Sequence, residues 1–295
     1  MKVFCLLLLL CIVGCATSKK GPKSLDEISQ EDFKPVKSVK YNKSDDNLSK
    51  VKSNFTSVSN DESIQRIYKY DGDVKLDGDL GKLASLCYEK KFDEAVSLVR
   101  KINKKYVSNP IFWNHVGTCF LLKKERRKAL LFFNKSISFK SNYAPALNNL
   151  GIMYVFENDY SRALVAFKKA KRYKNFSSIP RLNLANLYLN FGLFDKSIKE
   201  LSTLYAISSS DVDVLNLLGT AYLMKGEYKK SLSYYSKIDS DFFEDPRFGI
   251  NYAVALSFNG NNNKAKKMFA DISINQNKVW KDYYNTIKAI IGDKK

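Results

Sequence analysis

Small and large apolar residues return at a fixed interval of 34 positions along most of the chain, from Asn109 to Ile272. Each copy has a small residue, a second small residue twelve positions later, and a large apolar residue four positions after that. A degenerate earlier copy keeps this register through Leu83 and Ala95. A period of this length predicts stacked two-helix units. The three registers are occupied by Gly117, Gly151, Ala185, Gly219 and Ala253; by Ala129, Ala163, Ser197, Ser231 and Ala265; and by Phe133, Phe167, Leu201, Tyr235 and Phe269.

The residue types at these positions explain how the two helices of a unit would pack. Antiparallel helices approach closely where both carry small side chains, and large aromatic residues then fill the remaining volume. One unit cannot bury its apolar face alone, so six units are expected to stack. After them, Trp280, Tyr283, Ile287 and Ile291 recur at helical spacing and predict a capping helix and tail over 280–295. The predicted helix pairs cover 76–109, 110–143, 144–177, 178–211, 212–245 and 246–279.

The repeat resembles the tetratricopeptide repeat, a family of 34-residue helix–turn–helix units with aromatic, Leu, Gly, Tyr, Ala and Phe in a fixed order. The family's proline is displaced to the start of the next helix, and Asn109 and Asp245 precede two such prolines, where caps belong. The resemblance implies an all-α, right-handed α-solenoid of about six helix pairs whose first helices line a concave surface. It is carried by Trp113, Val116, Gly117, Phe120, Ala129 and Phe133 in the second copy, and by Leu150, Gly151, Tyr154, Tyr160, Ala163 and Phe167 in the third.

Asparagines gather on the predicted first helices. In the resembled family, Asn on this helix holds bound peptides, because an amide both donates and accepts hydrogen bonds. The alternative is that these side chains only cap helices or face solvent. The family's clamp for a C-terminal carboxylate is not matched, so chaperone-tail binding is not expected. The predicted partner-binding residues are Asn114, Asn148, Asn149, Asn183, Asn186 and Asn216.

The N-terminus reads as an export signal. An apolar run from Val3 to Val13 is too short to span a bilayer comfortably. The tetrad Ile12-Val13-Gly14-Cys15 resembles the bacterial lipobox, with an ordinary secretory peptide as the alternative. The resemblance implies a signal peptide over 1–14, diacylglycerol and an N-acyl chain on Cys15, and, because Ala16 follows, the periplasmic side of the outer membrane. The polar residues over 15–75 predict a lipidated, disordered tether, although 67–70 alternate weakly like a strand.

The formal net charge is +19, and it is unevenly spread. Residues 101–200 carry 19 Lys and Arg against 5 Asp and Glu. Either this is a solvated outer face, or it contacts an anionic surface such as lipid headgroups. Nucleic acid is disfavoured, because no RNA- or DNA-binding motif is present. The candidate anionic-surface residues are Lys123, Lys124, Arg126 and Arg127.

Cysteine and histidine are too few for most metal or His-dependent chemistry. The chain has five Cys and one His, with no metal-ligand spacing and no HExxH, G-x-S-x-G or phosphate-binding glycine loop. His115 is expected to be buried or to contact a partner. Cys87 and Cys119 are expected to be small core residues, although a disulfide between them stays open. We therefore expect no enzyme activity, no metal and no cofactor beyond the lipid on Cys15.

Together these features predict a membrane-anchored periplasmic scaffold that binds a protein or peptide and supports assembly of an envelope machine of the pilus, secretion or motility type. Its layout resembles that of pilotin-type lipoproteins. The alternative is an accessory subunit of a periplasmic cell-wall enzyme or protease complex. Membrane contact through the lipid anchor is expected, and neither nucleic acid nor a small-molecule substrate is. The partner, the pathway and the oligomeric state stay open.

Overall fold

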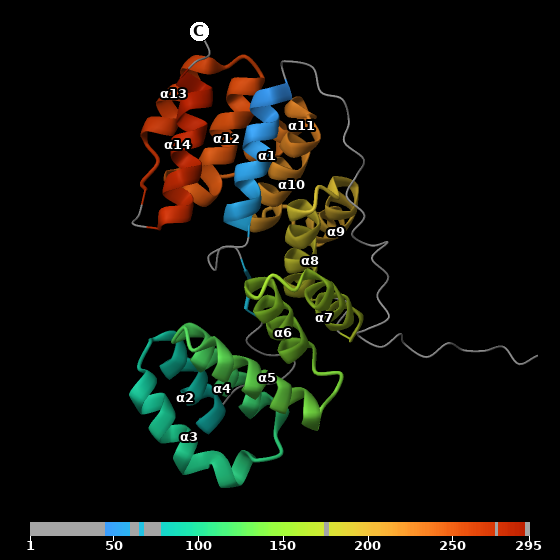
Figure 1. The fold of residues 1–295 in the computed structure, drawn as a ribbon, viewed down its shortest axis with the longest axis vertical. Coiled ribbons are helices and arrows are strands. Elements are labelled where there is room, and N and C mark those ends of the chain that lie inside the picture. Colours follow the sequence, from blue (N-terminus) through green and yellow to red (C-terminus); the bar gives the residue numbers. More distant parts are fainter. Residues whose placement is uncertain (1–44, 60–64, 68–77, 174–176, 275–276, 293–295) are drawn as a thin grey trace, which may run out of the picture.

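The computed structural model describes residues 45–59, 65–67, 78–173, 177–274 and 277–292, and all the regular structure in these ranges is helical. The predicted signal peptide, Cys15 and most of the predicted tether lie outside the described residues. Figure 1 shows the helices stacked along one long axis. The paired helices are α2 (Gly78–Tyr88) with α3 (Phe92–Tyr106), α4 (Pro110–Leu122) with α5 (Arg126–Phe139), α6 (Ala144–Phe156) with α7 (Tyr160–Tyr173), α8 (Ser178–Asn190) with α9 (Phe194–Ile207), α10 (Val212–Lys225) with α11 (Tyr228–Tyr235), and α12 (Pro246–Phe258) with α13 (Asn262–Ala270).

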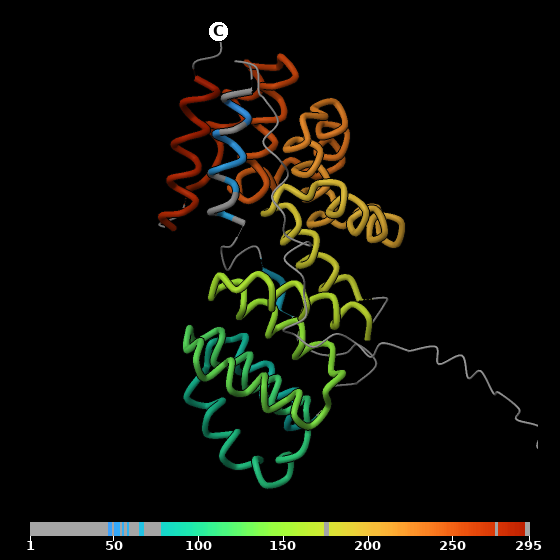
Figure 2. The backbone as a smooth tube through the Cα atoms, turned by 45° about the vertical axis from the view of Figure 1, so that its right-hand side comes forward, coloured from blue at the N-terminus to red at the C-terminus, as the bar shows by residue number. Residues whose placement is uncertain are grey.

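Six helix pairs therefore follow one another at the predicted period, and the predicted all-α solenoid is confirmed. Each first helix packs on its own second helix and on the next pair. A short 3₁₀ helix, η3 (Ser240–Glu244), lies between α11 and α12 and packs on α12, which the period did not indicate. The tube view in Figure 2 shows the pairs turning gradually along the stack.

The small residues allow the two helices of a pair to touch. A Cβ added at Gly151 would lie 2.5 Å from a ring carbon of Phe167, sixteen residues later on α7, and Phe167 is fully buried. Likewise, a Cβ added at Gly117 would lie 2.6 Å from a ring carbon of Phe133. At the second small position, Ser231 donates a hydrogen bond to the carbonyl of Gly219 at 2.8 Å. These contacts explain why the small and large residues repeat in phase.

The turn between the two helices of each pair contains one residue with a left-handed backbone conformation, and this position recurs every 34 residues. Gly192 and Gly226 have φ of +69° and +87°, which glycine adopts without steric cost. In the first three pairs the equivalent residues are Lys90, Lys124 and Asn158, with φ near +60°. Caps also fall where expected: the Asn109 side chain accepts from Ile111 N at 2.8 Å, and that of Asp245 accepts from Arg247 N at 2.9 Å.

The stack ends in α14 (Lys278–Gly292), in agreement with the predicted capping helix. Trp280, Tyr283, Ile287 and Ile291 are buried on it. The phenol of Tyr283 donates to Asn251 Oδ1 at 2.5 Å, and burial raises the Tyr283 pKa well above its usual value. The last pair is therefore covered, as an open stack requires.

A further helix, α1 (Asp45–Ser59), differs from the predicted disordered tether. Leu48, Val51, Phe55 and Val58 are buried and follow the spacing of one helix face. The helix packs against α14, α8 and α10, and Figure 1 shows it beside the C-terminal pairs. The polar composition of this stretch hid an amphipathic helix whose apolar face is covered by distant parts of the chain.

Candidate functional site

Asparagine amides form a hydrogen-bonded row along the first helices. Asn149 donates to Asn114 Oδ1 at 3.1 Å, across the boundary between α4 and α6. Asn183 donates to Asn148 Oδ1 at 2.9 Å, across the boundary between α6 and α8. Asn148 also donates to the neighbouring Asn149 at 3.1 Å. All four are buried, so the row links the first helices of three successive repeats.

The row binds a stretch of non-helical backbone. Residues 65–67, which we call the inner segment, pass over it, and the Arg66 N–H donates to Asn183 Oδ1 at 2.9 Å. The Arg66 carbonyl accepts from Asn183 Nδ2 at 2.8 Å and from Asn148 Nδ2 at 3.1 Å. Asn183 thus uses both its donor and its acceptor on one residue's backbone, and these two hydrogen bonds do not depend on that residue's side chain.

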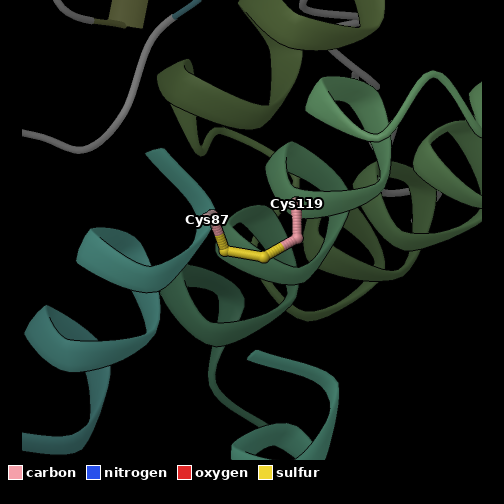
Figure 3. The surroundings of a disulfide bond; sticks show 2 residues. All are labelled: Cys87 and Cys119. Atoms are coloured by element: carbon pink, nitrogen blue, oxygen red, sulfur yellow. A yellow bond between two sulfur atoms is a disulfide. The ribbon is translucent and has the colours of Figure 1, made fainter. Parts of the chain in front are cut away.

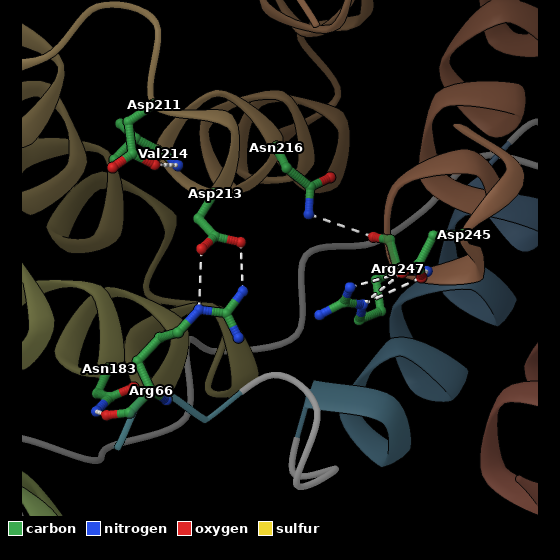
Figure 4. A network of polar contacts seen from close by, with 8 residues as sticks. All are labelled: Arg66, Asn183, Asp211, Asp213, Val214, Asn216, Asp245 and Arg247. Atoms are coloured by element: carbon green, nitrogen blue, oxygen red, sulfur yellow. Dashed lines mark hydrogen bonds and ion pairs between the residues drawn. The ribbon is translucent and has the colours of Figure 1, made fainter. Parts of the chain in front are cut away.

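The side chain of Arg66 reaches the next repeat. Its Nε donates to Asp213 Oδ2 at 2.9 Å, and its terminal nitrogen contacts Asp213 Oδ1, so the pair is bidentate (Figure 4). Asp213 lies in the first turn of α10, where a carboxylate also interacts favourably with the helix dipole. The side chains are 28% and 33% exposed, so the ion pair lies at the border between the buried row and solvent.

The remaining two predicted asparagines, Asn186 and Asn216, also lie on first helices but make different contacts. Asn186 lines a small cavity together with Arg66, Asp213 and Leu217. Asn216 donates to the Arg247 carbonyl at 3.2 Å and joins α10 to α12. The structure therefore brings Asn148 and Asn183 to the inner segment, with Asn114 and Asn149 supporting them, and places Asn216 in a link between repeats.

The basic cluster at the turn between α4 and α5 is partly engaged within the molecule. Lys123 Nζ lies 3.1 Å from Glu125, which also binds Lys128 at 2.5 Å. These two lysines lower the pKa of the Glu125 carboxyl. Arg126 stacks over the Phe156 ring at 4.4 Å. Lys124 and Arg127 are exposed. The cluster is a surface of mixed contacts in which part of the positive charge is locally neutralised.

The two cysteines of the repeats form a disulfide, which resolves the alternatives left by the sequence. Cys87 on α2 and Cys119 on α4 are bonded with a Cα–Cα distance of 4.9 Å (Figure 3). Both are buried, as expected, but they are not free core thiols. The bond joins the first helices of the first two repeats.

His115 is buried in the same region, with an exposed fraction of 1%. Both ring nitrogens lack a hydrogen-bond partner among the described residues. Burial lowers the pKa of this imidazole from 6.5 to about 4. The side chain is therefore neutral at physiological pH and is one of the buried residues of α4.

Two residues of the site, Arg66 and Asp213, were not predicted from the sequence. Arg66 lies in a stretch predicted as tether, and Asp213 stands beside the helix cap Asp211 without any motif. The weak alternation at 67–70 was the one available signal near Arg66. Within the described residues, no group of three or more His, Cys, Asp or Glu is arranged to hold a metal ion. Nor does any helix described there have the length and apolarity needed to cross a bilayer.

Comparison with known proteins identifies the fold. No family model matches the sequence. The chain is 24% identical over 140 residues to anaphase-promoting complex subunit CDC16 of Saccharomyces cerevisiae, covering 48% of this chain and 17% of that protein. It is 25% identical over 154 residues to the human cell division cycle protein 16 homolog, covering 51% and 24%. The chain thus matches only about a fifth of the length of these curated relatives.

Three solved structures share the arrangement. The anaphase-promoting complex assembly Cut9–Hcn1 has a TM-score of 0.60 at 18% identity, covering 75% of this chain and 43% of that chain. PilW, a type IV pilus biogenesis factor, has a TM-score of 0.58 at 16% identity, covering 69% and 96%. A tetratricopeptide repeat protein of Parabacteroides merdae has a TM-score of 0.53 at 17% identity, covering 70% and 84%. The chain therefore has the fold of a tetratricopeptide-repeat solenoid.

Proposed function

We propose that the protein is a membrane-anchored periplasmic scaffold that binds an extended segment of a protein partner and supports assembly of an envelope machine. The observation that carries this proposal is the grip of Asn148 and Asn183 on the backbone of Arg66. Every extended peptide offers the same backbone groups, so a groove that binds them suits a partner segment. The fold shared with PilW, a type IV pilus biogenesis factor, supports a pilus-type assembly among the possible machines.

Two features support an exported, lipid-anchored location. The Ile12–Cys15 tetrad resembles a lipobox, although it lies outside the described residues. The Cys87–Cys119 disulfide is typical of oxidising compartments such as the periplasm. We propose that acyl chains on Cys15 hold the protein at the outer membrane, and that Lys123, Lys124, Arg126 and Arg127 contact anionic headgroups.

Cell fractionation tests this location. Cys15→Ser is expected to move the protein from the membrane pellet to the soluble fraction, because no acyl chains are attached. Replacing Lys123, Lys124, Arg126 and Arg127 by Ala is expected to leave the lipidated protein in the pellet, since several acyl chains suffice. The same replacement in the lipid-free chain should abolish low-salt binding to anionic vesicles. A Cys15→Ser protein that stays in the pellet contradicts the anchor, and unchanged vesicle binding contradicts the headgroup contact.

Peptide binding tests the groove. A random peptide library is selected on the full chain carrying Arg66→Pro, which removes the backbone N–H that donates to Asn183, and dissociation constants of the recovered peptides are measured by fluorescence anisotropy. Asn148→Ala with Asn183→Ala is expected to weaken them at least tenfold, because both backbone contacts are lost. Asn216→Ala is the matched control on the same face and should change binding less than threefold. Equal affinities of the Arg66→Pro chain with and without the two alanine replacements would exclude these amides as the binding site.

A further inference from the structure

The concave groove already holds a ligand-like segment, and that segment belongs to the same chain. The inner segment lies across α6 and α8, more than eighty residues away from Asn148 in sequence. Its side chains alternate between two cavities, as those of a bound peptide strand would. Gln65 and Ile67 line one cavity of about 120 Å³, together with Leu121, Ile152 and Phe156, while Arg66 reaches Asp213 on α10.

Resting on the function proposed above, we propose that the inner segment is an intramolecular ligand, and that the partner is an extended peptide with an arginine followed by a large apolar residue. Such a peptide would take over the backbone contacts with Asn148 and Asn183, place its arginine on Asp213, and fill the cavity beside Leu121 and Ile152. The inner segment must leave the groove for this to happen.

Arginine is favoured at the central position by the geometry of the acidic partner. A guanidinium binds a carboxylate through two parallel N–H donors, whereas an ammonium is a compact point charge. Asp213 receives Arg66 in this two-donor arrangement (Figure 4). The nearby Asp211 is engaged differently, because its carboxylate accepts from Val214 N at 3.1 Å as the cap of α10. Asp211 therefore serves as a matched control for Asp213.

The apolar preference at the following position comes from the cavity. Ile67 is half-buried and packs with the cluster that contains Leu121, Ile152 and Phe156. The cavity beside it leaves unfilled volume, so a side chain larger than isoleucine has room there. Phe at this position should therefore bind at least as well as Ile.

Competition between the two ligands follows from their linkage. A segment tethered to its own binding site has an effective concentration in the millimolar range. On the N-terminal side, α1 is packed on α8, α10 and α14, and this keeps the inner segment close to the groove. A free peptide must be present above that concentration or bind more tightly than the inner segment. We therefore expect the wild-type chain to bind free peptides only weakly.

The experiment uses the full chain and a fluorescein-labelled peptide with the sequence of residues 62–70, ESIQRIYKY. In the chain, Arg66→Pro removes both the backbone N–H that Asn183 accepts and the guanidinium that Asp213 binds. This variant should bind the peptide at least tenfold more tightly than the wild type. Arg66→Ala, which keeps the backbone N–H, should lie between them and serves if the proline variant does not fold.

Specificity is measured in the Arg66→Pro chain. A peptide with Ala in place of its arginine should bind at least tenfold more weakly. That discrimination should disappear when Asp213→Asn is added and persist when Asp211→Asn is added. With Asp213→Lys, a peptide carrying Glu at the same position should become the better ligand.

The outcomes separate this inference from the proposed function. Equal peptide affinity in the wild type and both Arg66 variants overturns the intramolecular competition. Binding that ignores the peptide's arginine overturns the assigned partner while the groove itself stands. If neither this peptide nor any library peptide binds the opened chain, the proposed function fails as well. A chain that dimerises by exchanging its inner segment would show a doubled mass in light scattering, and would also overturn the competition within one chain.

Discussion

Replacing Cys87 and Cys119 together by alanine is expected to lower the free energy of unfolding by about 3–4 kcal/mol. The disulfide closes a loop of 32 residues, and in the chain-entropy model a loop of that size restricts the unfolded chain by this amount. The loss should be local. In a stacked repeat protein each unit contacts only its neighbours, so unfolding can begin at one end.

The first repeat is the end that most needs the bond. At its C-terminal end the stack is closed by α14, whereas α2 and α3 pack on each other and mainly on α4 among the described residues. The first copy also has Leu83 at the register where later copies have Gly or Ala. The disulfide joins α2 to α4 and so holds a degenerate terminal unit in place.

Urea unfolding by circular dichroism and amide hydrogen exchange measure this effect. In the alanine variant, protection should fall first in α2 and α3 while α8 to α13 stay close to wild type. A reducing agent should reproduce the change in the wild type and have no effect on the variant, which is the internal control. Unchanged protection in α2 and α3 after loss of the bond would contradict the argument.

Much of the solenoid was available from the sequence, because its packing is local and repeated. The small residues at Gly117 and Gly151 and the aromatic residues sixteen positions later report contacts within one helix pair. The caps at Asn109 and Asp245 act on the next two or three residues. Features fixed by neighbours in the chain leave a periodic signal.

Features that depend on distant partners were harder to predict. The apolar positions of α1, among them Val51 and Phe55, were visible, but the surface that covers them is formed by α8, α10 and α14. The spacing of Cys87 and Cys119 did not by itself indicate a disulfide; the bond depends on how two adjacent first helices pack, which only the structure shows.

The candidate site likewise has a part that was predicted from the sequence and a part that was not. The asparagines could be placed on the concave face because they recur on first helices, although no rule of spacing told which of them would hold backbone. Asp213 is an ordinary acidic residue in a first turn until Arg66 is brought to it from 147 positions away. Long-range pairs of this kind have no local pattern and appear only in three dimensions.

The second large effect is expected from pH, through the single histidine. Burial lowers the pKa of His115 to about 4 in the folded protein, against 6.5 when it is exposed. Below pH 6.5 the unfolded chain binds a proton at this residue and the folded chain does not, so falling pH favours unfolding. Between pH 6.5 and pH 4 this difference amounts to about 3 kcal/mol of stability, and it stops growing once the folded protein is protonated as well.

His115→Phe isolates this contribution, because the chain has no other histidine and the carboxyl groups are the same in both proteins. The variant keeps a planar ring and removes both buried nitrogens. The free energies of unfolding of the wild type and the variant, measured in urea from pH 7.5 to pH 4 with the disulfide intact, should separate progressively below pH 6.5, with the wild type less stable. An imidazole proton resonance that titrates near pH 6.5 in the folded wild type, or stability curves that stay parallel down to pH 4, would contradict the buried neutral state. Because the ring lies on α4, the acid-induced loss should appear first in the same N-terminal repeats that the disulfide holds together.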